Sequence, residues 1–306
     1  MVERAVLCTA FASSEDGAHL VGLAVPCEPF GPRFGAHGSA CPTVTRQIRF
    51  RLANRAAARE SLPMPQPIRI AMWSGPRNIS TAMMRAWGNR RDTFVVDEPF
   101  YACYLNATGK RHPGADEVIA AGETDWRKVV VHLTGPIPKD RQIFFQKHMT
   151  HHLLPEVDRE WLSTVTNCFL IRDPREVIAS YIKKRDDPAL EDLGFTQQAE
   201  IFDFVRNRTK SVPSVVDAKD VLEDPERILR LLCDAVGVQF SKSMLSWPPG
   251  LRETDGPWAR HWYAEVAKTT SFRPYRRTDH KVPEHLRQIY DRCREYYEQL
   301  YQHRLR

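Results

Sequence analysis

The chain has 306 residues, of which 42% are hydrophobic and 27% are charged, and its formal net charge is +6. This length suits one large α/β domain or two small ones. No apolar run is long enough to cross a membrane, so no membrane partner is expected. The positive charge suits a polyanionic small ligand or a nucleic acid. No basic stripe with interleaved aromatic residues is present, which disfavours nucleic acid.

The seven cysteines include no C-x-x-C pair, and their number is odd. These two features argue against a zinc site and against a disulfide framework. We therefore expect free thiols in a reducing cytoplasm, and no bound metal. His151 and His152 resemble a metal-ligating pair, but adjacent histidines on a turn are predicted to be solvated.

Residues 1–66 differ in composition from the rest of the chain. They are rich in Gly, Ala, Ser and Arg, lack lysine, and show no hydrophobic period. Three interpretations stay open: a signal peptide in residues 1–12, a basic transit-like segment in residues 46–59, or a natural start at Met64. In the third case residues 1–66 form a disordered extension or reflect an over-long gene model. The folded domain is predicted to span residues 67–306.

Short apolar runs alternate with helical patterns along this domain. The predicted strands are residues 68–72, 93–96, 142–146, 165–171 and 214–216. The predicted helices are residues 80–89, 112–121, 126–133, 176–184, 195–209, 225–236, 258–268 and 284–303. This alternation predicts an α/β fold with a parallel sheet flanked by helices on both faces, and ligands bind such sheets at the carboxyl ends of the strands.

The loop after the first predicted strand has the layout of an anion site. Strand, turn and helix follow one another, so free N–H groups of the first helical turn can bind phosphate or sulfate. Arg77 is the only cation there, and no G-x-x-x-x-G-K-[ST] pattern occurs in the chain. The alternative is a plain connection in which Ser80 caps the helix. The predicted anion-binding residues of this loop are Ser74, Gly75, Pro76, Arg77, Asn78, Ile79, Ser80 and Thr81.

A second anion site is predicted after the fourth strand. Asp173 fits an N-cap, Pro174 the first helical position and Glu176 the third position of a capping box. Arg172 then ends a strand, and Ser180 lies two turns into the helix, so both side chains can converge on one small anion. Alternatively, Arg172 pairs with a carboxylate and Ser180 is exposed or bonded to its own helix.

The stretch from Ile171 to Tyr181, I-R-D-P-R-E-V-I-A-S-Y, resembles the 3′-phosphate-binding motif of P-loop sulfotransferases. These enzymes use 3′-phosphoadenosine 5′-phosphosulfate (PAPS) as the sulfate donor. The resemblance implies that Arg172 and Ser180 bind the 3′-phosphate, and that the loop of residues 73–81 binds the 5′-phosphosulfate. The pattern is closest to a divergent, mostly bacterial branch of the family whose acceptors are poorly defined.

Two lysines typical of the family are replaced. Trp73 stands where many members have a lysine just before Ser-Gly, and Gln146 stands at the lysine of a lysine-x-histidine stretch. Arg77 and Lys147 are the candidate substitutes. The resemblance also implies a general base, for which the candidates are His148, after the third strand, and Glu98, after the second.

Together these features predict a sulfotransferase that moves the sulfuryl group of PAPS to a small-molecule hydroxyl or amine without a metal. The predicted catalytic residues are His148, Glu98 and Arg77. A nucleotide-dependent kinase is one alternative. A nucleotide-binding pseudoenzyme is another, suggested by Trp73 and Gln146.

Near the C-terminus, Trp258 can either cover the acceptor or pack, whereas Trp262 is predicted to pack. Arg273, Arg276 and Arg277 are predicted to be solvated, with a contact to the 3′-phosphate as the alternative.

Overall fold

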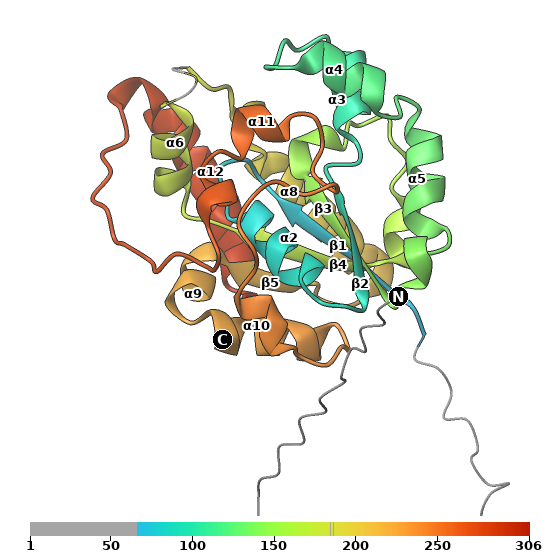
Figure 1. Cartoon of the computed structure of the whole chain (residues 1–306). Helices are drawn as coiled ribbons and strands as arrows, with labels where there is room; N and C mark the ends of the chain where they lie inside the picture. The colour runs from blue at the N-terminus through green and yellow to red at the C-terminus, as the bar shows by residue number, and fades with distance from the viewer. Residues whose placement is uncertain (1–65, 184, 186) are drawn as a thin grey trace, which may run out of the picture. The chain divides into compact units, whose positions relative to one another are not determined.

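The computed structural model describes residues 66–183, 185 and 187–306, so nearly all of the predicted N-terminal extension lies outside the described residues. Five strands form one sheet in the order β2-β3-β1-β4-β5, and every neighbouring pair is parallel (Figure 1). The strands are β1 (Ile68–Ser74), β2 (Thr93–Asp97), β3 (Ile143–Met149), β4 (Thr166–Ile171) and β5 (Ser214–Asp217). The predicted α/β fold is confirmed.

Helices connect the strands, as parallel pairing requires. The α-helices are α2 (Ser80–Gly88), α3 (Tyr101–Thr108), α4 (Ala115–Ala121), α5 (Trp126–Thr134), α6 (Pro174–Tyr181), α7 (Leu190–Leu193), α8 (Phe195–Thr209), α9 (Ala218–Glu223), α10 (Pro225–Ala235), α11 (Ala259–Trp262) and α12 (Arg287–Tyr301). The 3₁₀ turns are η1 (Pro138–Asp140), η2 (Thr150–His152), η3 (Glu160–Thr164), η4 (Lys242–Leu245), η5 (Val266–Lys268) and η6 (Glu284–Leu286).

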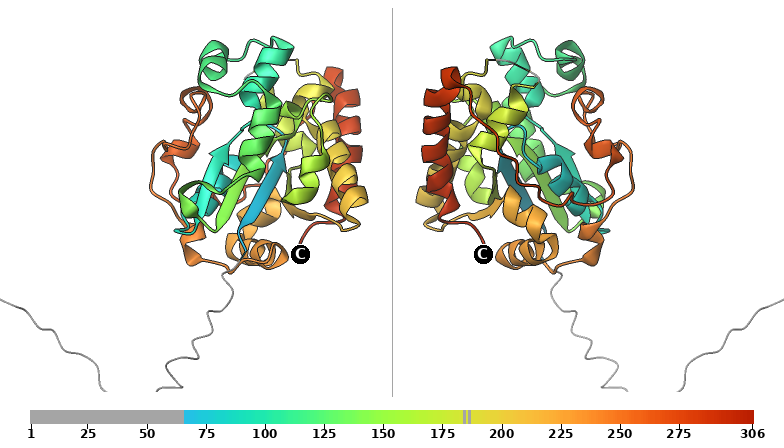
Figure 2. Two further views of the ribbon diagram at one scale, coloured as in Figure 1. Left: turned by 90° about the vertical axis from the view of Figure 1, so that its right-hand side faces the viewer. Right: turned by 90° about the vertical axis from the view of Figure 1, so that its left-hand side faces the viewer.

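The helices cover both faces of the sheet (Figure 2). On one face, α2 and α10 pack on a core that contains Met72 and Phe145. On the other face, α8 and α12 pack on a core that contains Trp73, Phe144 and Phe169. Burial from both sides explains why the strands consist of nearly continuous apolar runs.

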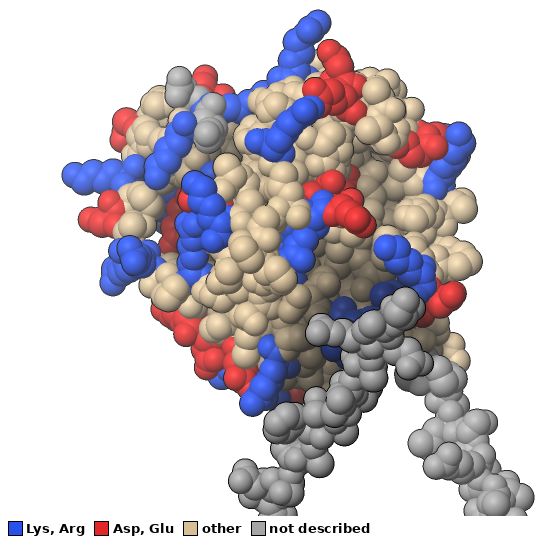
Figure 3. All heavy atoms as spheres, in the orientation of Figure 1, with Lys and Arg blue, Asp and Glu red and all other residues tan. Residues whose placement is uncertain are grey.

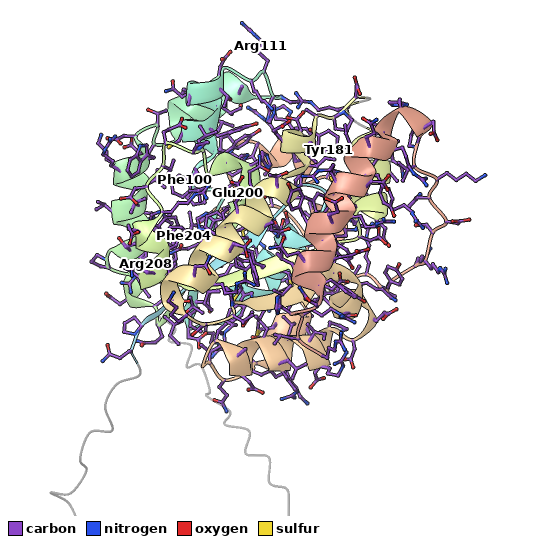
Figure 4. The ribbon with its side chains drawn as sticks, turned by 180° about the vertical axis from the view of Figure 1, so that it is seen from behind. Phe100, Arg111, Tyr181, Glu200, Phe204 and Arg208 are labelled. Carbon is purple, nitrogen blue, oxygen red and sulfur yellow. The ribbon has the colours of Figure 1, made fainter. Side chains whose placement is uncertain are left out.

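The back of the molecule shows how α8 is oriented. Seen from behind, Glu200, Phe204 and Arg208 follow one another along α8 at helical spacing (Figure 4). Glu200 pairs with Arg159 at 3.4 Å, and Arg208 pairs with Glu160 at 2.8 Å. This row therefore joins α8 to the segment that leads into β4. All four side chains are partly exposed, so the two pairs add little stability.

Several predicted helices have different bounds in the structure, and three helices, α3, α7 and α9, were not predicted. The helix expected at residues 112–121 begins at Ala115, because Gly114 adopts a φ of +77°. Residues 258–268 form only α11 and a 3₁₀ turn, and the last helix begins at Arg287 rather than at residue 284. The unpredicted α3 is apolar around most of its circumference and has no side-chain cap, so the sequence gives it neither a period nor a start signal.

None of the described helices is long and apolar enough to cross a membrane. Positive and negative side chains are interspersed over the face seen in Figure 3. Among the described residues, no group of three or more His, Cys, Asp or Glu side chains is arranged to hold a metal ion. The four described cysteines are unpaired, buried thiols: Cys103, Cys168, Cys233 and Cys293.

Candidate functional site

A cavity of about 480 Å³ opens at the carboxyl ends of the strands. Its wall contains the loop after β1, the N-terminal turn of α2, the ends of β2 and β3, and the C-terminal part of α6. Tyr181, labelled in Figure 4, ends α6 and lines this cavity. The volume lies within the range of small-molecule sites, about 300–1,000 Å³. The cavity therefore lies where the parallel sheet predicts a ligand.

The loop after β1 presents an uncapped helix start to the cavity. Strand β1 continues to Ser74, so the loop proper begins at Gly75. The N-cap of α2 is Ile79, and no side chain caps this helix, which overturns the alternative that Ser80 is the cap. Ser80 and Thr81 both line the cavity. The free N–H groups and the positive dipole end of α2 make this turn suited to an anion.

The loop is held in place from two sides. The Asn78 side-chain amide donates to the Leu170 carbonyl of β4 over 3.0 Å. A Cβ on Gly75 would lie 2.7 Å from the Leu193 carbonyl oxygen, so only glycine fits this close approach. The position of this turn is therefore fixed by the protein itself.

Arg77, Arg172 and Ser180 meet at one side of this loop. The Arg77 Nε donates to Ser180 Oγ over 3.0 Å, and the Arg172 Nη1 donates to the Arg77 carbonyl over 2.7 Å. Arg172 also pairs with the Glu176 carboxylate at 3.0 Å, in agreement with the alternative prediction for Arg172. The Ser180 hydroxyl binds Arg77 and not its own helix, so that part of the alternative is wrong. Burial and the neighbouring charge of Arg172 lower the pKa of Arg77. An anion between the two guanidinium groups would relieve this repulsion.

Local capping explains why α6 begins where it does. Asp173 accepts from the Arg175 backbone N–H over 2.8 Å, and Pro174 occupies the first turn, both as predicted. Glu176 does not close a capping box. Its carboxylate instead binds Arg172 and the Tyr275 hydroxyl, the latter over 2.8 Å. Glu176 thus orients the arginine rather than the helix start.

A second charged group lies at the ends of β2 and β3. Asp97 is the register partner of Lys147, so the two side chains meet at the carboxyl edge of the sheet. The Lys147 Nζ contacts Asp97 Oδ1 at 2.8 Å, Glu98 Oε1 at 2.5 Å and the Tyr263 hydroxyl at 2.9 Å. The Tyr263 hydroxyl donates to Asp97 Oδ2 over 2.6 Å. We call Asp97, Glu98, Lys147 and Tyr263 the buried charge cluster.

The buried charge cluster contains two carboxylates and one ammonium group. The carboxylates hold the pKa of Lys147 well above its usual value, so Lys147 stays charged. Burial raises the pKa of Glu98, Lys147 opposes this shift, and Asp97 adds to it. The raised pKa brings the protonation of Glu98 closer to neutral pH. Its backbone φ of +44° is left-handed, which is a strained conformation for glutamate.

Tyr263 reaches this cluster from the far end of the chain. The segment before it is fastened to α2 by a buried pair, in which Arg85 donates to both Asp255 oxygens over 2.7 and 2.6 Å. Sequence reasoning missed Tyr263, because no local motif marks a tyrosine that lies more than a hundred residues from its partners. Lys147 was proposed only as a possible cation.

His148 does not reach the cavity. Side chains of a strand alternate between faces, so Lys147 points one way and its neighbours Gln146 and His148 the other. His148 is 1% exposed and stacks on Trp73 at 4.2 Å between ring centroids. Burial, and secondarily Lys147, lowers its pKa to about 3. Of the two predicted bases, only Glu98 lines the cavity.

The two replaced lysine positions also face the core. The Trp73 Nε1 donates to Asn167 Oδ1 over 2.9 Å, and the Gln146 side-chain amide donates to the Leu133 carbonyl over 2.8 Å. Both side chains are fully buried. A lysine at either position would have pointed into apolar packing rather than into the cavity.

One expectation about the surroundings is corrected, and two others agree with the structure. His151 and His152 are not a solvated pair: they line the cavity, and burial lowers both of their pKa values. Trp262 packs against the core as predicted and also lines the cavity, and Trp258, which was left open, packs in the core. Arg273, Arg276 and Arg277 are all exposed as predicted, and Arg273 also lines the cavity.

A model of the family described as "Sulfotransferase domain" matches residues 68–287. Branched-chain-amino-acid aminotransferase-like proteins 1 and 2 of Arabidopsis thaliana are both 36% identical to this chain, over 213 and 205 residues. These matches cover 68% and 66% of this chain, but only 37% and 36% of the two relatives. The chain therefore spans little more than a third of their length.

Solved structures show weaker similarity. The sulfotransferase domain of the Synechococcus PCC 7002 olefin synthase is 17% identical, with a TM-score of 0.49, covering 78% of this chain and 96% of that one. The sulfotransferase domain from the curacin biosynthetic pathway is 16% identical, with a TM-score of 0.47, covering 76% and 98%. On the family match, which spans most of the residues from β1 to the start of α12, the chain belongs to the sulfotransferase-domain family.

Proposed function

We propose that this protein is a cytoplasmic sulfotransferase that moves the sulfuryl group of PAPS to a hydroxyl or amine of a small molecule. One observation carries the proposal: a single cavity contains both the Arg77–Arg172–Ser180 group and the Glu98–Lys147 pair. Family membership supports the reaction class. The unpaired thiols of the described chain suit a reducing compartment.

The residues present fit a donor with several phosphates. PAPS, when bound, supplies an activated sulfuryl group on a phosphate that can leave. Arg172 and Ser180 would bind its 3′-phosphate, and the backbone of residues 74–81 would bind its phosphosulfate. Arg77 belongs to the loop but already contacts Ser180, so its guanidinium would lie between the two anionic groups. The mutual repulsion of Arg77 and Arg172 supports an anion there.

Glu98 is the proposed general base. Its Oε1 is held by Lys147, whereas its Oε2 accepts no hydrogen bond from the described residues. This oxygen would take the proton of the acceptor as the acceptor attacks sulfur in line. Lys147 stays charged beside the carboxylate and would stabilise negative charge that develops in the cavity. His148 is not assigned this role, because it faces the core.

The two alternative functions are less well supported. A kinase would need a phosphate-binding lysine in the loop, and the loop has none. The pseudoenzyme hypothesis depended on Trp73 and Gln146, and both face away from the cavity. The names of the Arabidopsis relatives describe proteins of which this chain matches little more than a third.

The decisive test is calorimetry with 3′-phosphoadenosine 5′-phosphate (PAP) and with AMP, which lacks the 3′-phosphate. We expect PAP to bind about 10- to 100-fold more tightly, because charged hydrogen bonds contribute about 1.5–3 kcal/mol. Arg172→Ala should remove this difference. Arg175→Ala, three residues further on in the first turn of α6 and outside the main cavity, is the matched control and should preserve it. Equal affinities of the wild-type protein for PAP and AMP would overturn the assignment.

A further inference from the structure

The two oxygens of the Glu98 carboxylate have different surroundings. Oε1 lies 2.5 Å from the Lys147 ammonium group. No hydrogen bond to Oε2 is found within the described part of the chain, and His152 Nδ1 lies 3.9 Å from this oxygen. The Tyr263 hydroxyl, which also faces Glu98, donates its proton to Asp97. His152 is therefore a candidate donor to the oxygen that would take the proton.

The His152 ring is held rigidly in this position. It stacks between Tyr101, at 4.6 Å and an angle of 3°, and Tyr104, at 4.7 Å and 29°. The residue is 3% exposed, and its Nδ1 is buried without a hydrogen-bond partner among the described residues. A buried polar atom without a partner costs about 1–3 kcal/mol, so native proteins rarely leave one unused. Glu98 Oε2, at 3.9 Å, is an acceptor within reach of a small movement.

We infer that His152 is a positioning residue for Glu98, and that its Nδ1–H donates to Oε2 when the carboxylate is ionised. This inference rests on the proposed function. An approach of about 1 Å would bring the two atoms to the usual length of a hydrogen bond to a carboxylate. Lys147 on Oε1 and His152 on Oε2 would then fix the plane of the carboxylate. A carboxylate oxygen accepts two hydrogen bonds, so Oε2 can still receive the acceptor.

The proton balance follows from this arrangement. The acceptor's O–H or N–H bond breaks while its oxygen or nitrogen forms the bond to sulfur, and the bond from sulfur to the leaving phosphate oxygen breaks. The proton goes to Glu98 Oε2. His152 keeps its own proton and gains none, because burial holds the pKa of its ring well below the usual value. His152 acts only by orienting Glu98 and stabilising its ionised form.

Other titratable groups face the pair and must stay unchanged in any test. Glu98 is faced by Asp97, Lys147, Tyr101 and Tyr263. His152 is faced by His112, Lys147, His148 and His151. A substitution of His152 alone leaves all of these groups in place, so a changed titration of Glu98 can be attributed to the lost donor.

The test compares His152→Phe with His152→Asn in the full-length protein. Phenylalanine keeps a ring between the two tyrosines but has no donor, whereas the asparagine amide can place a donor near the position of Nδ1. The titration of Glu98 is followed through its carboxyl stretch in infrared difference spectra against Glu98→Gln. We expect His152→Phe to raise the pKa of Glu98 by about one unit, the equivalent of 1.36 kcal/mol, and His152→Asn to restore it.

The acidic limb of kcat/KM against pH should move with the carboxyl titration. No shift in His152→Phe, or the same shift in both variants, would overturn the inference and leave His152 with a packing role. The infrared titration needs no turnover, so it decides this point even if no acceptor is sulfated. Failure of PAP to bind the wild-type protein would instead count against the proposed function. Thermal melting of both variants verifies that they fold.

Discussion

The two halves of the cavity are built in different ways. The proposed donor half, formed by the loop after β1 and by α6, consists of half-buried side chains held by helix starts and backbone carbonyls. The proposed acceptor half is the buried charge cluster, whose side chains come from three separate stretches of chain and are held mainly by one another. Substitutions in the donor half should therefore alter ligand affinity, whereas those in the acceptor half should alter stability and proton transfer.

The largest expected effect separates the halves by activity. Glu98→Gln keeps the shape of the side chain but removes the base, so kcat should fall about 10²- to 10⁴-fold. PAP affinity, measured by calorimetry, should not change, because the donor half is untouched. Glu265→Gln is the control: this exposed carboxylate also lines the cavity, and its loss should leave kcat within a few-fold. A variant of Glu98 with full turnover would contradict its role as the base.

The next effect separates the halves by stability. Lys147→Met leaves two buried carboxylates without their cation, so the free energy of unfolding should fall by about 3–5 kcal/mol at neutral pH. Denaturant unfolding measures this. Lys128→Met, which loses an exposed pair with Glu123, should change it by less than about 0.5 kcal/mol.

The pH dependence of this loss has a definite sign. Burial already raises the pKa of Glu98, and removing Lys147 should raise it further. The destabilisation comes from the ionised carboxylate, so it is fully present above the raised pKa. It should shrink as the pH falls through the raised pKa and disappear below 4.5, the ordinary value for glutamate, where the group is protonated in both states. A deficit that stays constant with pH would mean that lost packing, not charge, causes it.

The smallest effect concerns the replaced lysine. Trp73→Phe removes the hydrogen bond to Asn167 and should lower the free energy of unfolding by about 1–3 kcal/mol. Turnover and PAP affinity should stay the same, because the ring faces the core. If kcat instead fell as far as in Glu98→Gln, position 73 would take part in catalysis and the two halves could not be separated in this way.

The sequence predicted most of the fold because its strands are continuous apolar runs bounded by Gly, Pro and Asp. The start of α6 followed from Asp173 and Pro174 alone, since capping is local. Helix α3 and the early end of the helix expected at residues 258–268 could not be predicted, because tertiary packing rather than periodicity defines them.

The site was predictable to the extent that it is local. Arg172 and Ser180 stand at a spacing that places both on one side of a helix start, and the structure brings them to one cavity. Trp73 was assigned to the loop because β1 was predicted to end at residue 72. The pairing of β1 with β3 and β4 continues to Ser74, and this pairing cannot be read from the sequence of β1 alone. His148 and Lys147 are neighbours in sequence, and their side chains point to opposite faces of the sheet. The sequence does not show which of the two faces the cavity, so the assignment of the histidine to the core and of the lysine to the cavity needed the structure.

The left-handed backbone of Glu98 has a practical consequence for anyone who engineers this protein. A glycine at this position would relieve the conformational strain and remove a buried carboxylate, so it should make the fold more heat-tolerant. A screen that rewards thermal tolerance alone would therefore enrich glycine at position 98. Some substitutions would raise heat tolerance and lower sulfate transfer. The positions of such substitutions would identify residues that are kept for function at a cost in stability.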